Sequence, residues 1–483
     1  MFRKLFGNWR LVPGLLALLL FAGTWMPAAV WAETERELYE VRRLLQQFHL
    51  NSPGEDVLNK DSIEAIVESL GDPYTEYYTK EEWEDFQADL EMQFTGIGVR
   101  IVQEDGVVYV EDLIPGGPAE AAGLLPGDAL VSADGESLVG LTIAEVQQKL
   151  LGPAGTTVVV GVSRDGQKLS FTITRASIQI PVATGIMMGD GVGYLELSGF
   201  TSNAGELFDA ELRKLEEAGL KSLIIDLRGN GGGYVGEARK IASHFIENGV
   251  LAHLRDRSGV VSSIRVSGGG KPYPVTVLVN GGTASAAELL AGALQDYRVA
   301  ALVGTQTFGK GLVQTMVALS DGGMIKFTIQ EYVTPKGRKV DREGLRPDRI
   351  VAGESEQLLA AFRLAGGQKV EVTFPKASII VNGVRVPFPN AYLERDGKTY
   401  VRLRLIAAIA GADVGYDAKT GTVTLKRGDT VYRLPRNDSR LVNKNGWNMI
   451  ELFSAVSLFP DLKAETENGM LKISAGSESA GSE

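Results

Sequence analysis

The sequence has no cysteine among its 483 residues and only three histidines, His49, His244 and His253. The lack of cysteine excludes disulfides, thiolate nucleophiles and thiolate metal sites. Positive charge is also in deficit, because 49 lysine and arginine residues face 60 aspartate and glutamate residues, a net charge of −11. Nucleic-acid binding needs a basic surface, which this composition disfavours. We therefore expect no nucleic-acid partner, no cofactor and no metal ion.

The N-terminus has a basic and then an apolar section. Residues 2–10 carry three positive charges, residues 11–31 carry no charge, and small residues flank Trp31 at Val30 and Ala32. This order is typical of a secretory signal peptide. The apolar section is also long enough to span a bilayer uncleaved. We expect residues 1–32 to be a signal peptide or membrane anchor, and the protein to be extracytoplasmic, secreted or anchored to the outer face of a bacterial cytoplasmic membrane.

The rest of the chain is long enough for about three domains. Residues 33–91 predict a helical region, in which Leu38, Val41, Leu45 and Phe48 form an apolar stripe at helical spacing. The stripe would pack either on the protein's own core or against a second copy in a homodimer. Strand and helix patterns alternate over residues 176–352, which predicts a layered α/β domain.

Two small-residue segments in this α/β region carry candidate catalytic groups. Ser285 follows an apolar strand and opens a helical stretch, and Lys310 lies between Gly309 and Gly311. A serine needs a base to become a nucleophile, and a desolvated neutral lysine can replace histidine in that role. Ser285 with Glu288 is also a capping-box pattern, in which the serine would only start a helix. The spacing alone leaves both interpretations open.

The amino-acid sequences of these segments resemble those of a known family. Gly-Thr-Ala-Ser285-Ala-Ala-Glu, then Thr-Phe-Gly-Lys310-Gly, and upstream Leu227-Arg-Gly-Asn-Gly-Gly-Gly233 are similar to the carboxy-terminal processing peptidases, tail-specific proteases with a Ser-Lys dyad. The resemblance begins near Asp72-Pro-Tyr-Thr75 and implies a crotonase-like protease core. It implies that Ser285 is the nucleophile, Lys310 the base and Gln314 the residue that orients Lys310.

The same resemblance implies which backbone groups would stabilise the oxyanion formed during peptide hydrolysis. The backbone N–H of Ala286, the residue after the nucleophile, would be one oxyanion donor, and Gly233 would supply the other. Asp296 matches an aspartate implicated in some family members, although it would equally well cap the end of the helix that Ser285 begins.

Residues 92–175 resemble a PDZ domain inserted before the core. Gly96-Ile97-Gly98 stands at the position of the carboxylate-binding loop and departs from the common Gly-Leu-Gly-Phe form. Glycines there would free backbone N–H groups to bind the terminal carboxylate of a peptide that pairs with the adjacent strand.

Residues 370–475 show short strands separated by Asn-Gly, Asp-Gly and Thr-Gly turns, and they resemble the domain named after the copper amine oxidase N-terminus. The segment contains no histidine and no cysteine, so it lacks good copper ligands and reads as a binding module. Residues 476–483 are rich in serine, glycine and glutamate and predict a disordered tail.

The sequence thus predicts a multidomain α/β protein: N-terminal helices, a PDZ domain, a protease core and a mostly β C-terminal domain. The predicted activity is a serine endopeptidase that cleaves proteins near or from their C-termini, with the PDZ domain binding the substrate C-terminus. One rival is an inactive PDZ adaptor of the cell envelope. A second is a dinucleotide site, because Gly231 to Gly236 reads Gly-x-Gly-x-x-Gly and Asp256 follows 20 residues later.

Overall fold

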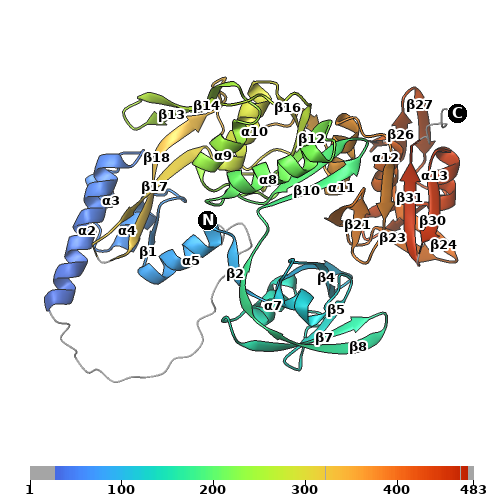
Figure 1. Cartoon of the computed structure of the whole chain (residues 1–483), viewed down its shortest axis with the longest axis horizontal. Coiled ribbons are helices and arrows are strands. Elements are labelled where there is room, and N and C mark those ends of the chain that lie inside the picture. The colour runs from blue at the N-terminus through green and yellow to red at the C-terminus, as the bar shows by residue number, and fades with distance from the viewer. Residues whose placement is uncertain (1–27, 321, 468, 477–483) are drawn as a thin grey trace.

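The computed structural model describes residues 28–320, 322–467 and 469–476. Figure 1 shows N-terminal helices, an α/β core and a β-rich C-terminal domain side by side, with a further β-rich unit beneath the core. The predicted multidomain α/β class is confirmed. Residues 1–27 of the expected signal segment and 477–483 of the expected tail lie outside the described residues. In the part that is described, no helix is long and apolar enough to cross a membrane.

The core is built on a six-stranded sheet that is parallel except for its antiparallel edge pair β10–β11. Strands buried on both faces need apolar residues at nearly every position, and every residue of β12 and of β15 is buried. In sheet order the strands are β10 (Ala183–Gly189), β11 (Val192–Leu197), β12 (Ser222–Asp226), β15 (Val275–Val279), β16 (Ala300–Gly304) and β19 (Arg349–Ile350).

Helices cover both faces of this sheet. On one face lie α8 (Ala204–Glu217), α9 (Val235–Ala242) and α10 (Ala286–Asp296), and on the other lies α11 (Glu354–Leu364). The two-residue period of a strand sorts its side chains between the faces. Leu223 and Ile225 of β12 therefore join the core under the three helices, while Ile224 joins the core under α11.

A second sheet runs in the order β1-β18-β13-β14, and β17 also pairs with β18. Its strands are β1 (Glu76–Tyr78), β13 (Asn248–Asp256), β14 (Val261–Ser267), β17 (Leu312–Ala318) and β18 (Met324–Val333). The N-terminal region joins the core through this sheet, because β1 pairs with β18 along its whole length. Figure 1 shows β1 beside β17 and β18, with α5 next to it.

The N-terminal helices are α2 (Ala28–Phe48), α3 (Glu55–Leu58), α4 (Ile63–Ser69) and α5 (Lys80–Leu90). Of the predicted stripe, Val41 and Leu45 are fully buried against Ile325 and Phe327 of β18, whereas Phe48 is 46% exposed. The stripe therefore packs on the protein's own core. Helix α5 falls within the predicted helical region, although its bounds were not predicted, whereas strand β1 was not expected.

Residues 92–175 form a small β-rich unit whose hydrophobic core contains only its own residues. Its elements are β2 (Gln93–Gly96), β3 (Val99–Glu104), β4 (Val107–Leu113), α6 (Pro118–Ala122), β5 (Ala129–Ala133), β6 (Glu136–Ser137), α7 (Ile143–Leu150), β7 (Thr157–Arg164) and β8 (Gln167–Thr174), and β9 (Ala176–Gln179) follows directly after it. Strands β2 and β9, where the chain enters and leaves the unit, pair with each other.

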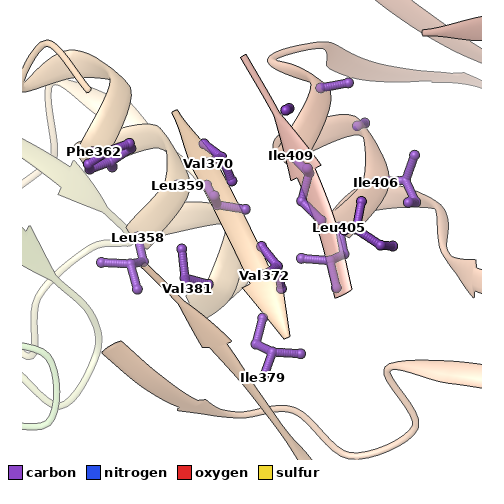
Figure 2. Close-up of a cluster of buried hydrophobic side chains, with 14 of the residues drawn as sticks. Leu358, Leu359, Phe362, Val370, Val372, Ile379, Val381, Leu405, Ile406 and Ile409 are labelled. Atoms are coloured by element: carbon purple, nitrogen blue, oxygen red, sulfur yellow. The ribbon is translucent and has the colours of Figure 1, made fainter. Parts of the chain in front are cut away.

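The C-terminal domain shares its core with the protein's main sheet. Figure 2 shows the apolar residues of α11, β20, β21 and α12 that meet there, and Tyr194, Ile224 and Leu278 of the main sheet belong to the same cluster. The elements after α11 are β20 (Val370–Thr373), β21 (Ser378–Val381), β22 (Val384–Pro387), β23 (Tyr392–Arg395), β24 (Lys398–Arg402), α12 (Leu403–Ala410), β25 (Asp413–Asp417), β26 (Thr422–Arg427), β27 (Thr430–Leu434), β28 (Leu441–Lys444), β29 (Trp447–Glu451), α13 (Leu452–Leu458), β30 (Lys463–Glu467) and β31 (Met470–Ala475).

Polar contacts link the unit of residues 92–175 to the C-terminal domain. Glu104 forms an ion pair of 2.7 Å with Lys376, and Asp105 forms one of 3.3 Å with Lys444. Both acidic residues lie where β3 turns into β4, at the other end of β3 from Gly98.

Candidate functional site

Ser285 occupies a strained turn between β15 and α10. Its backbone has φ +56° and ψ −118°, a conformation that non-glycine residues seldom adopt and that is often found at functional sites. Side chains hold the turn from both sides: the Asn280 amide oxygen accepts the N–H groups of Gly229 and Gly282, and the Thr283 hydroxyl donates to the Leu227 carbonyl.

The glycine turn after β12 lies directly against Ser285. A Cβ atom on Gly232 would come within 2.7 Å of the Ser285 Cβ and 2.9 Å of the Ala286 backbone nitrogen. Gly233 has φ +139°, and a Cβ there would meet the Phe200 carbonyl oxygen at 2.2 Å. Only glycine fits this approach, which brings the backbone of residues 231–233 to the serine.

Glu288 ties the serine segment to the lysine segment. Its Oε2 accepts the backbone N–H groups of Ser285 at 3.0 Å and Lys310 at 2.9 Å. Its Oε1 accepts the Thr307 hydroxyl at 2.5 Å and the Gly309 N–H at 2.8 Å. Burial raises the pKa of Glu288, and these hydrogen bonds offset part of that rise. The glutamate of the predicted capping box thus reaches back to Ser285 and also anchors the chain at Lys310.

Lys310 is only 8% exposed. Its Nζ lies 5.0 Å from the ring centroid of Tyr74, so an aromatic ring covers the amine. Burial, followed by repulsion from Lys326, lowers the pKa of Lys310 to about 7, although the carboxylates of Glu76, Asp72 and Glu288 act in the opposite direction. An amine with this pKa is neutral in a large fraction of molecules at neutral pH.

Gln314 lies on β17, at a bulge that follows Val313. Its Nε2 donates to the Thr328 hydroxyl at 3.3 Å. On the far side of β18, Thr75 accepts the Thr328 N–H and donates to Asp72 at 2.7 Å. A polar chain thus runs from Gln314 into the N-terminal region.

Asp72 lies at the end of this polar chain and pairs with a buried histidine. The Nε2 of His49 is 3.3 Å from Asp72 Oδ2. Burial raises the pKa of Asp72, but hydrogen bonds with His49, Thr328, Thr75 and the Tyr74 backbone together lower it to about 2. Residues 72–75 therefore contact both groups: the Tyr74 ring covers Lys310, and Asp72 and Thr75 connect through Thr328 to Gln314. The position of this motif in the sequence did not reveal these contacts.

One cavity of about 130 Å³ brings Ser285, Lys310, Gln314 and Gly233 together. Phe86 and Leu90 of α5 and Met316, Lys326 and Tyr332 of the second sheet also line this cavity. These additional lining residues were not predicted from the sequence, because α5 and β18 carry no motif that links them to Ser285.

Asp296 lies away from this cavity. It is buried at the last turn of α10, pairs with Arg338 at 2.7 Å and accepts the Lys336 N–H at 2.8 Å. These two contacts join the end of α10 to the turn after β18.

The predicted carboxylate loop lies at the entry to β3. Gly96 pairs with Ala176, Ile97 is buried in the core of its own unit, and Gly98 has φ +81°. The Ile97 and Gly98 carbonyls accept N–H groups from Ala119 and Ile114. A Cβ on Gly96 would lie 3.2 Å from Leu151, at the end of α7, and 3.3 Å from the Phe94 ring. The loop therefore has apolar neighbours.

Comparisons with known proteins agree with this arrangement. Residues 191–351 match Peptidase family S41, and residues 109–164 match the PDZ domain family. The carboxy-terminal processing protease CtpB of Bacillus subtilis (strain 168) is 30% identical over 426 residues, which cover 84% of this chain and 87% of that protein.

The chain belongs to the carboxy-terminal processing proteases of Peptidase family S41. A probable CtpA-like serine protease of Staphylococcus haemolyticus (strain JCSC1435) is 31% identical and covers 74% of this chain and 75% of its own length. A solved photosystem II D1 C-terminal processing protease is 29% identical, covers 68% of this chain and 97% of that one, and has a TM-score of 0.47.

The C-terminal domain of this protease matches the copper amine oxidase N-terminal domain over residues 360–452. Copper sites in proteins use imidazole or sulfur ligands, and this segment contains no histidine, no cysteine and a single methionine, Met449. Met449 is 1% exposed. No group of three or more His, Asp or Glu side chains in the described residues is placed to hold a metal ion. The side chains present do not fit a copper ion.

The dinucleotide interpretation does not fit the protease core. Gly231 to Gly233 turn toward Ser285, and the strand after α9 belongs to the second sheet, so Asp256 ends a strand outside the parallel sheet. The Asp256 carboxylate instead accepts the Ser258 N–H and hydroxyl in a local turn. A nucleotide fold would need that carboxylate beside the glycine turn.

Proposed function

We propose that this protein is an extracytoplasmic serine endopeptidase that cleaves protein substrates near their C-termini through a Ser285–Lys310 dyad. One observation carries the proposal: Ser285 and a buried Lys310 line the same cavity, and Glu288 binds both of their backbone N–H groups. A pure adaptor would have no use for a desolvated lysine beside a strained serine, since both are costly to maintain.

In the proposed reaction the Ser285 Oγ attacks the carbonyl carbon of the scissile peptide, and its proton passes to the neutral Nζ of Lys310. The backbone N–H groups of Ala286 and Gly233 stabilise the oxyanion. When the C–N bond breaks, Lys310 returns the proton to the leaving amine. Lys310 then takes a proton from a water molecule, whose oxygen attacks the acyl carbon. As the ester bond breaks, Lys310 returns this proton to the Ser285 Oγ and the second product leaves.

Two further parts complete the proposal. Gln314 orients Lys310, and a neutral amide does so without the pKa increase that a carboxylate would cause. The PDZ domain binds the substrate C-terminus through the backbone of Gly96, Ile97 and Gly98. The basic and apolar N-terminal segment supports the extracytoplasmic location.

Hydrolysis of a long peptide with a free apolar C-terminus tests the activity. Ser285→Ala and Lys310→Ala should each abolish turnover while circular dichroism stays that of the native protein, because dyad members act as a unit. A wild-type protein that binds the peptide but never cleaves it would support the adaptor instead. Near-wild-type turnover by Lys310→Ala would exclude the lysine as base.

A further inference from the structure

Lys326 is a second buried lysine on the same side of the second sheet as Gln314. In the antiparallel pair β17–β18, Gln314 lies opposite Thr328 and Met316 lies opposite Lys326. Because alternate strand residues share a face, Lys326 points the same way as Thr328. The cavity confirms this direction, since Lys326 lines it together with Lys310 and Ser285.

The N-terminal region holds Lys326 in place. Glu76 of β1 is the register partner of Lys326, and the two side chains form an ion pair of 2.5 Å. The Lys326 Nζ also donates to the Tyr78 hydroxyl at 2.8 Å and lies 4.8 Å from the ring centroid of Phe86. A carboxylate and aromatic faces are both favourable contacts for an ammonium group. The Lys326 side chain is only 6% exposed, so solvent screens its charge weakly.

Charged groups surround Lys310 from several elements. Lys326 comes from β18, Glu76 from β1, Asp72 from the loop before β1, and Glu288 from α10. Of these four, Lys326 is the one cation, and it lines the same cavity as Lys310. The neutral Tyr74 ring covers the amine, and the Asp72 carboxylate is paired with His49. The local field at Lys310 therefore includes one ammonium group and three carboxylates from these elements, and the buried Asp341 carboxylate lies beside Gly311.

We propose that Lys326 is a positioning residue of the protease: its fixed ammonium charge, clamped by Glu76, keeps Lys310 in the neutral form that a base requires. This inference rests on the proposed role of Lys310. A neighbouring cation disfavours a second positive charge in the same cavity. It therefore increases the fraction of Lys310 that is ready to accept the Ser285 proton, and it favours the later return of that proton to the leaving amine.

The proposal assigns a function to the N-terminal region as well. Strand β1 and helix α5 supply Glu76, Tyr78 and Phe86, so the charge beside the dyad depends on a segment that lies about 200 residues before Ser285. Figure 1 shows this segment at the edge of the second sheet, next to β17 and β18.

The test measures how fast a small fluorophosphonate labels the full-length protein as a function of pH. Ser285 Oγ displaces fluoride from phosphorus, its proton passes to Lys310, and no peptide subsite is needed. The variants are Lys326→Met, Lys326→Gln and the charge-preserving Lys326→Arg. Lys214→Met, an exposed lysine on α8 with the same change in net charge, is the matched control.

Wild type should label with a rate constant that rises through about pH 7. In Lys326→Met and Lys326→Gln the midpoint should move upward by roughly one unit, the size expected of one nearby charge in a partly buried site. At pH 6 this shift corresponds to an approximately tenfold slower reaction, with little change at pH 9. Lys326→Arg and Lys214→Met should keep the wild-type midpoint.

The rate constant describes the molecules that label, so a smaller folded fraction lowers the amplitude and leaves the midpoint unchanged. An unchanged midpoint in both neutral variants would overturn the role of Lys326, and so would an arginine variant that behaves like the methionine one. In either case Lys310→Ala, run alongside, should still fail to label. Wild-type labelling of Lys310→Ala would instead contradict the proposed dyad itself.

Discussion

The Glu288 carboxylate accepts the backbone N–H of Lys310 at 2.9 Å, although the two residues are 22 positions apart. The same oxygen accepts the Ser285 N–H, so one buried side chain sets the relative position of the two proposed catalytic residues. Both carboxylate oxygens accept two hydrogen bonds each. The site therefore needs four acceptor positions and has no place for a donor.

Glu288→Gln should accordingly impair the protein. In either orientation the amide NH₂ would face two donors, which leaves buried polar groups unpaired at a cost of about 1–3 kcal/mol in the free energy of unfolding. We expect kcat/KM to fall roughly a hundredfold or more, as positioning errors of this kind do. Urea denaturation and peptide hydrolysis measure both effects. Glu217→Gln, an exposed glutamate on α8, should change neither.

Activity should rise with pH through about 7 and level off above it, because the proposed base is the deprotonated amine of Lys310, whose pKa is lowered to about 7. Lys310→Arg should be inactive at every pH from 6 to 10, since arginine stays protonated. The measurement is kcat/KM against pH with a short peptide. A flat profile from pH 6 to 9 in wild type would argue against Lys310 as the base.

Lys310→Met should make the folded protein more stable. The unfolded chain holds the lysine proton up to its ordinary pKa of 10.5, while the folded protein releases it near 7. Between these values the unfolded state binds more protons, so the free energy of unfolding of wild type rises with pH. The methionine variant avoids this cost and should gain about 1–3 kcal/mol at pH 7. The gain should shrink toward pH 10.

Urea denaturation of wild type and Lys310→Met at pH 7, 8.5 and 10 checks this prediction. A gain that stays constant across these three pH values would show that the stabilisation comes from packing and not from the buried amine.

A free C-terminus should bind the PDZ domain better than its amide. The amide lacks the carboxylate charge that the N–H groups of the Gly96–Gly98 loop would bind, and apolar end residues should bind best beside Phe94 and Leu151. Full-length Ser285→Ala protein allows binding to be measured without cleavage. We expect the amide to weaken binding strongly and to slow cleavage of short peptides less. Equal affinities for acid and amide would exclude carboxylate recognition.

The sequence predicted those residues of the candidate site that lie within recognisable motifs. Ser285, Lys310, Gln314 and Gly233 were identified from motifs, and the structure brings them into one cavity. Lys326, Tyr74 and Phe86 were missed, because their proximity to Lys310 depends on the pairing of β1 with β18, a contact between segments about 250 residues apart. The Asp72-Pro-Tyr-Thr75 motif was noticed, but no local pattern shows that its aromatic ring covers a distant lysine.

The fold shows the same division. Strands β12 and β15 were predicted because uninterrupted apolar runs must be buried on both faces. The bounds of helix α5 were not predicted within the helical region 33–91, because none of its residues is buried. The apolar stripe of the first helix was compatible with an internal contact or a homodimer contact, and only the structure shows that Val41 and Leu45 pack on β18 of the same chain.

The PDZ unit and the C-terminal domain are joined to the protease core in different ways. This difference decides which of the two can be deleted without disturbing the core. The PDZ unit closes its own core, and its entry and exit strands β2 and β9 pair with each other, so a short loop could replace it with the loss only of its polar contacts to the C-terminal domain, such as those of Glu104 and Asp105. The C-terminal domain cannot be deleted in this way, because its hydrophobic core is shared with the central sheet. Tyr194, Ile224 and Leu278 of the central sheet pack inside it, so deleting it would expose one face of the sheet that carries the Ser285 turn. In this protein the C-terminal domain, together with α11, covers one face of the central sheet of the protease core.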